Sequence, residues 1–147
     1  MEVRGITIHN TGNDLSAREV YKLLEKNKNR NYCHFLIDEN EVINCFSVSQ
    51  PASHTGKGYD FGNMYTLAVE ICRSRSDLET YMKAQDRAVE KIKELLKEYN
   101  LTNDDIYFHS DFNTVRCPHR IFEIYKTKGD FINECFIQGW KCWNKCS

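Results

Sequence analysis

The strongest constraint on this chain is a set of three side chains that bind zinc well and lie near its two ends. His9 belongs to the segment ITIHNTG, and His109 follows another short apolar run, with Cys117 eight residues later and Pro118 directly after it. Two imidazoles and one thiolate leave one tetrahedral position of a zinc ion open, which is typical of a catalytic site. The spacing alone is not specific, because a half-buried histidine and an ordinary core cysteine give the same pattern.

Length and composition indicate one globular domain spanning residues 1–147. Hydrophobic residues make up 41% and charged residues 28% of the chain, and the formal net charge is −1. This charge gives no reason to expect attraction to nucleic acid. No apolar run approaches the roughly 18 residues that span a bilayer. The N-terminus lacks the apolar region of a secretory signal, so we expect synthesis in the cytoplasm and release by another agent. The sequence leaves the oligomeric state open.

Hydrophobic patterns predict an α/β fold in which helices pack on a small mixed sheet. A capping box at Ser16–Glu19 predicts the start of one helix, and a long amphipathic pattern predicts another. A C-terminal helix is expected at about residues 130–146. The expected strands are 3–9, 32–37, 41–48, 65–72 and 106–109, and the long helix is 78–99.

Glu70 lies inside the apolar segment YTLAVEIC, which we expect to form a central strand. A carboxylate at such a position costs free energy unless it faces a polar site. We therefore take Glu70 as a candidate acid or base. The alternative is a carboxylate at the rim of the site, paired with Lys57, Arg73 or Arg116.

The chain has seven cysteines, so complete internal pairing is impossible. Reduced thiols are the default in a reducing cytosol. Cys135, Cys142 and Cys146 share one face of the expected C-terminal helix. A second metal site, a disulfide or a dimer contact would use them in this arrangement. We favour the simpler interpretation that they are small apolar side chains that dock the helix.

Separated motifs give a more specific indication than any single spacing. The segments ITIHNTG, HFLIDENEVI, SHTGKG, LAVEIC and FHSDFNTVRCPHRI occur in this order. In that order they resemble the zinc-dependent N-acetylmuramoyl-L-alanine amidases of the amidase-2 type, which include phage lysozyme-like amidases and the peptidoglycan recognition proteins. The resemblance covers roughly residues 4–125, and it does not extend to the tail.

The resemblance implies a fold, a metal and a reaction. It implies that His9, His109 and Cys117 bind Zn²⁺, and that the substrate and partner is bacterial peptidoglycan. The bond cleaved would join N-acetylmuramic acid to L-alanine, as in an endolysin or autolysin that acts on the cell wall after release. Zinc can lower the pKa of a bound water to about 7 and polarise a carbonyl group.

The resemblance also assigns roles to two further residues. Glu70 matches a catalytic glutamate of some relatives, and His54 matches a histidine near the substrate groove that could bind the substrate or the developing oxyanion. The alternative for His54 is a solvated loop residue. The phage branch has a tyrosine where this chain has Cys33, and a lysine where it has Val115. The neighbouring Tyr32 is expected to point to the other face of a strand, so we do not expect it to substitute.

Four more residues have weaker assignments. His34 lies in an expected strand and is interpreted as structural. His119 and Arg120 follow Cys-Pro, and we expect them to fix the ligand loop or line the groove. Tyr59 and Asn63 belong to the glycine-rich segment 51–62, interpreted as a surface loop, and could contact glycan or peptide.

Two other functions remain open at this stage. One is a non-catalytic module that binds peptidoglycan, although all three ligand types are retained. The other is a zinc peptidase or another zinc hydrolase, although the sequence contains no HExxH motif.

Overall fold

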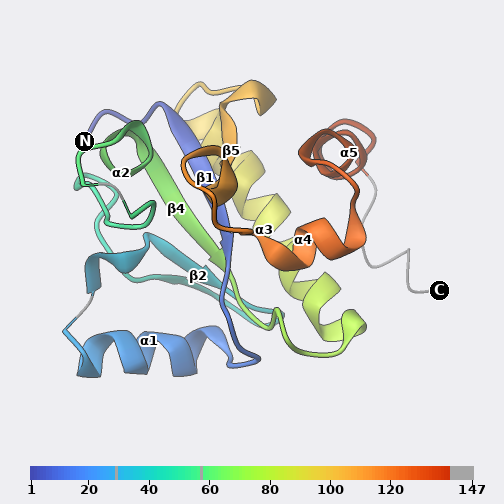
Figure 1. Ribbon diagram of the computed structural model, residues 1–147, viewed down its shortest axis with the longest axis horizontal. Helices are drawn as coiled ribbons and strands as arrows, with labels where there is room; N and C mark the ends of the chain where they lie inside the picture. Colours follow the sequence, from blue (N-terminus) through green and yellow to red (C-terminus); the bar gives the residue numbers. More distant parts are fainter. Residues whose placement is uncertain (29, 57, 140–147) are drawn as a thin grey trace.

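The computed structural model describes residues 1–28, 30–56 and 58–139, which form a five-stranded sheet with helices on both faces (Figure 1). The strand order is β3-β2-β4-β1-β5. The β2–β4, β4–β1 and β1–β5 pairs are parallel, and the β2–β3 pair is antiparallel. The strands are β1 (Gly5–Asn10), β2 (Phe35–Ile37), β3 (Val42–Asn44), β4 (Thr66–Ile71) and β5 (Ile106–Phe108).

The two main helices lie on opposite sides of this sheet (Figure 1). Because side chains alternate along a strand, Ile6 and Ile8 enter the larger core beneath α3, whereas His9 points to the other face. Helix α1 packs on β2 and β3, on the same face of the sheet as His9. The α-helices are α1 (Ala17–Lys26), α2 (Phe61–Tyr65), α3 (Leu78–Glu98), α4 (His119–Ile124) and α5 (Lys128–Ile132).

The predicted start of α1 is confirmed, and the structure adds a link to the hairpin. The Ser16 side chain accepts from the backbone of Glu19, and the Glu19 carboxylate accepts from the backbone of Ser16. The buried Asp38 carboxylate accepts from the backbone N–H of Ala17 at 2.7 Å. The same carboxylate also accepts from Glu41 at 2.9 Å, within the β2–β3 turn. One carboxylate thus joins the helix N-terminus to the hairpin, where an anion is favourable.

The hairpin, the central strand and the long helix are confirmed, with strands shorter than expected. Helices α2 and α4 are not among the predicted elements, because both are too short to show a hydrophobic period. Three short 3₁₀ segments also flank the strands and loops, at Arg30–Tyr32, Asn103–Asp105 and His109–Asp111.

The expected C-terminal helix at 130–146 is wrong in its extent within the described residues. Helix α5 continues into a π-helical turn at Asn133–Ile137, and Gly139 then has a φ of +68°, a conformation that ends a helix. Cys135 is buried in the main core, as a small apolar residue would be. Cys142 and Cys146 lie outside the described residues. None of the helices described has the combination of length and apolar character that a membrane span needs.

His34 is a structural residue of the sheet, as expected. Its Nδ1 accepts from the backbone N–H of Ala68 at 2.9 Å, and its Nε2 faces the carbonyl oxygen of Gln50 at 3.0 Å. Burial lowers the pKa of His34, which keeps the ring neutral and able to accept at Nδ1.

We therefore expect His34→Ala to lower the free energy of unfolding by about 2–3 kcal/mol. The substitution leaves the buried backbone N–H of Ala68 in β4 without its acceptor, and it leaves a cavity. Urea denaturation followed by circular dichroism measures this. Asn44→Ala, at an exposed position of β3, is the control and should change stability by less than about 0.5 kcal/mol. Equal stabilities of the two variants would contradict the assigned role.

Candidate metal site

The structure brings together the three side chains that the sequence placed far apart. His9 lies near the end of β1, His109 directly follows β5, and Cys117 precedes α4. Strands β1 and β5 are parallel neighbours, so their ends reach the same edge of the sheet. The backbone N–H of Ser110 donates to the carbonyl of Cys117 at 3.0 Å, which closes the loop between the last two ligands. The candidate ligand atoms all lie within 4.8 Å of one another.

The protonation states of these groups suit a cation. Burial lowers the pKa of His9 well below its usual value and also lowers that of His109, so both rings are neutral near pH 7. Burial raises the pKa of the Cys117 thiol to about 12, although a hydrogen bond from the backbone of Asn10 opposes the shift. The thiolate therefore needs a positive charge beside it, and a metal ion would supply that charge.

His54 fixes the orientation of His9. Its Nε2 lies 3.1 Å from the carbonyl oxygen of Gly62, which can only accept, so this nitrogen carries the hydrogen. Burial lowers the pKa of His54 to about 4, so the ring is neutral and its Nδ1 is the acceptor. His9 Nε2 lies 3.0 Å from that Nδ1 and must donate to it. The lone pair of His9 is therefore on Nδ1, which lies 3.9 Å from the sulfur of Cys117.

This arrangement differs from the role that the resemblance implied for His54. Both ring nitrogens are engaged within the protein, and the side chain is buried. A residue so placed can orient His9, one of the three candidate ligands, and has no ring nitrogen left for a substrate carbonyl. Hydrogen bonds from outer residues commonly set the tautomer of metal-binding histidines in this way.

The segment that carries His54 is tightly held. The side-chain oxygen of Asn63 accepts from the backbone N–H groups of His54 and Thr55, at 2.8 and 2.9 Å. A Cβ at Gly62 would lie 2.4 Å from a methyl carbon of Thr55, so only glycine fits there. Asn63 is therefore a buried support rather than an exposed contact, whereas Tyr59 is 92% exposed.

His109 has a support that the sequence analysis missed. The side-chain amide of Asn113 lies 2.7 Å from His109 Nε2 and donates to the Thr55 carbonyl at 2.8 Å. A hydrogen bond with the same backbone group raises the pKa of His109, against the effect of burial. Thr55 thus connects the supports of both histidines. The position of Asn113 four residues after His109 was the only indication in the sequence.

Glu70 faces the same site from β4. It is the register partner of His9 across the β1–β4 ladder, and its Oε1 lies 4.0 Å from His9 Nδ1. Neither carboxylate oxygen has a hydrogen-bond partner among the described residues, and burial raises the pKa of Glu70 to about 7. Arg73, one alternative partner, instead pairs with Glu39 at 3.2 Å. A buried and unpartnered carboxyl beside three candidate ligands is typical of a functional group.

The expectation that Tyr32 points away from the site is wrong. Tyr32 lies in a 3₁₀ turn before β2, so the alternation of a strand does not apply to it. Its hydroxyl group is close enough to Glu70 to oppose the rise of that pKa, and the negative charge of Glu70 raises the pKa of Tyr32. The side chain of Cys33 instead packs in the core beneath α1.

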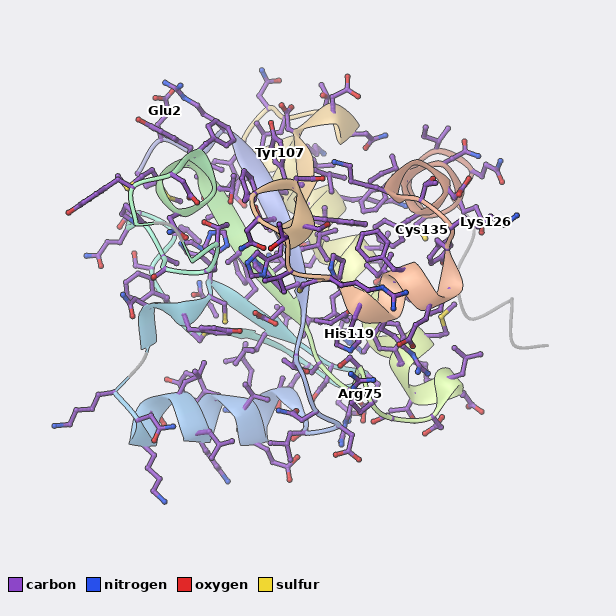
Figure 2. The ribbon with its side chains drawn as sticks, viewed as in Figure 1. Glu2, Arg75, Tyr107, His119, Lys126 and Cys135 are labelled. Atoms are coloured by element: carbon purple, nitrogen blue, oxygen red, sulfur yellow. The ribbon has the colours of Figure 1, made fainter. Side chains whose placement is uncertain are left out.

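Arg120 holds the loop that carries Cys117, which is one of the two roles expected for it; the other was to line the groove. Its backbone N–H donates to the side-chain oxygen of Asn10 at 2.9 Å, and its guanidinium donates to the carbonyl of Ser76. His119 lies at the start of α4 with Arg75 close below it in Figure 2. Nearby arginines, Arg75 foremost, add to burial in lowering the pKa of His119.

Comparisons with known proteins identify the family of this chain. The sequence profile described as N-acetylmuramoyl-L-alanine amidase matches residues 1–120. The N-acetylmuramoyl-L-alanine amidases CwlA and XlyB of Bacillus subtilis are each 38% identical over 122 residues, which are 82% of this chain and 45% and 38% of theirs. This chain therefore spans less than half the length of these relatives.

Solved structures are covered over more of their length than these relatives are. The structure of PlyL has a TM-score of 0.84 at 30% identity, covering 91% of this chain and 84% of that one. The catalytic domain of PlyG has a TM-score of 0.83 at 31% identity, covering 91% and 81%. The fold is that of the α/β domains of the amidase-2 class. The chain belongs to the N-acetylmuramoyl-L-alanine amidase family.

We expect His54→Ala to weaken zinc binding by about 10- to 100-fold, because His9 loses the acceptor that sets its tautomer. Competition with a chromogenic chelator measures this affinity without reference to activity. In His54→Gln, the amide oxygen can accept from His9 and the amide nitrogen can donate to Gly62, so most of the affinity should return. Unchanged affinity in a folded His54→Ala variant would show that His54 does not position the ligand.

Proposed function

We propose that this domain is a zinc-dependent amidase that hydrolyses the bond between N-acetylmuramic acid and L-alanine in bacterial peptidoglycan. The observation that carries the proposal is the meeting of His9, His109 and Cys117 beside the buried carboxyl of Glu70. The family membership supplies the reaction, since the related B. subtilis proteins bear the name of this activity. The same comparison supports a setting at the bacterial cell wall.

Two neutral imidazoles and one thiol fit zinc better than the other common divalent ions. Calcium and magnesium prefer oxygen ligands, whereas nitrogen and sulfur donors in this ratio suit a tetrahedral zinc ion with one open position. His9 would bind through Nδ1, since its Nε2 donates to His54. A zinc ion held there supplies Lewis-acid chemistry, polarising the scissile carbonyl and acidifying water.

Glu70 would provide the proton transfer that amide hydrolysis also requires. A general base works best when its pKa is near the working pH, and burial raises the pKa of this carboxyl to about 7. It would take a proton from water and later deliver one to the leaving amine of L-alanine. Tyr32, whose hydroxyl group faces the carboxyl, would hold Glu70 in position.

Two other functions make different predictions. A non-catalytic peptidoglycan-binding module would have no use for a buried carboxyl of raised pKa beside the ligands. A zinc peptidase would use the same groups but cleave within the stem peptide. The new amino group separates the two hydrolases, because only the amidase releases the amine of L-alanine.

We expect Glu70→Gln to retain one zinc ion per chain and to lose about 100- to 10,000-fold in the rate of wall hydrolysis, since the amide cannot accept the proton. Loss of turbidity of purified cell walls gives the rate, and elemental analysis gives the metal content. Glu39→Gln, which removes a half-buried carboxylate paired with Arg73 outside the site, is the matched control and should retain full activity. If Glu70→Gln clears walls at the normal rate, this residue is not the base.

We expect removal of zinc by a chelator, or Cys117→Ser, to abolish wall hydrolysis together with bound metal. Adding zinc back should restore the chelated protein. End-group analysis of the digested wall should find new L-alanine amines. Zinc at one ion per chain without any released amine would support the binding module instead.

A further inference from the structure

Two buried cysteines close the base of the β2–β3 hairpin. Cys33 lies just before β2 and Cys45 directly follows β3. Their sulfur atoms are 3.2 Å apart, and the Cys45 thiol also donates to the carbonyl oxygen of Cys33 at 2.9 Å. The backbone N–H of Cys45 donates to the carbonyl of His34 at 2.9 Å, so the main chain holds the two residues in this pairing. Two thiols held in contact need only a small rotation to bond.

The surroundings favour this pair over other thiols. Cys33 is fully buried and Cys45 is 8% exposed, so neither can readily reach a second molecule. Cys72 belongs to the same apolar cluster, beneath α1. It follows β4, however, and its N–H donates to Ile37 at the far end of β2. Cys33 and Cys72 therefore lie beyond opposite ends of one strand.

We propose that Cys33 and Cys45 form a disulfide when the chain meets an oxidising medium. The oxidant is a low-molecular-weight disulfide such as oxidised glutathione. One cysteine thiolate attacks it, forming a mixed disulfide and releasing one glutathione thiolate. The second cysteine thiolate then attacks the protein sulfur of that mixed disulfide and releases the other glutathione. The protein loses two protons and two electrons, and one glutathione disulfide becomes two thiols.

Burial should confine this reaction to folding or local opening. The hydrogen bond with the Cys45 thiol raises the pKa of Cys33, and burial raises it further, so the folded chain holds little thiolate there. The bond would close a short ring around an edge hairpin and reduce the freedom of the unfolded chain. The same ring begins next to Tyr32, which faces Glu70. This inference does not rest on the proposed reaction.

The test is to refold the reduced protein with and without oxidised glutathione, alkylate the remaining thiols and digest it. We expect mass spectrometry to find a peptide pair joined through Cys33 and Cys45, lighter by two hydrogens. The melting temperature should rise by roughly 5–10 °C relative to the reduced form and fall again with a reductant. Cys72→Ser should retain both results, whereas Cys45→Ser should lose both.

The wild-type peptide map decides the question even if a variant fails to fold. Alkylation of both Cys33 and Cys45 after oxidative refolding would overturn the proposal. So would a pairing of either residue with Cys72 or with a cysteine of the tail.

Discussion

The parallel pairing of β1 with β4 on one side and β5 on the other is the constraint on which the site depends. It aligns His9 with Glu70 across one ladder, and it places His109 beyond the end of the other. Parallel strands deliver residues from distant parts of the chain to a common edge, where rigid backbone holds them. A slip of β1 by one residue would turn His9 into the core beneath α3.

Around this sheet edge, the protein supports its polar groups by hydrogen bonds among buried residues. His9 contacts His54, which is bonded to the Gly62 carbonyl. His109 contacts Asn113, which is bonded to the Thr55 carbonyl. Both sets of hydrogen bonds end within residues 54–63, where the Asn63 side chain accepts from the backbone of His54 and Thr55. Glu70 is the exception, because neither of its oxygens makes a hydrogen bond of normal geometry among the described residues, although the hydroxyl group of Tyr32 faces it. A carboxyl left in this state destabilises the fold, and such groups occur where chemistry requires them.

Several elements could be predicted because their information is local. The capping box at Ser16, the long amphipathic helix and the apolar strand around Glu70 each depend on residues close in sequence. Helices α2 and α4 escaped prediction because five or six residues show no hydrophobic period. The C-terminal helix was predicted too long because its apolar stripe continues past Gly139, where the backbone turns. Tyr32 was misplaced because a 3₁₀ turn interrupts the alternation of the strand.

The sequence by itself determined the family, the order of the main elements and the identity of His9, His109, Cys117 and Glu70 as candidates, because residue type and motif order carry that information. Only the tertiary structure decided that these groups converge, that His54 supports His9, and that Cys33 touches Cys45. The physical reason is that hydrogen-bond direction and distance between remote segments arise from strand register and packing. No local pattern of residues encodes them.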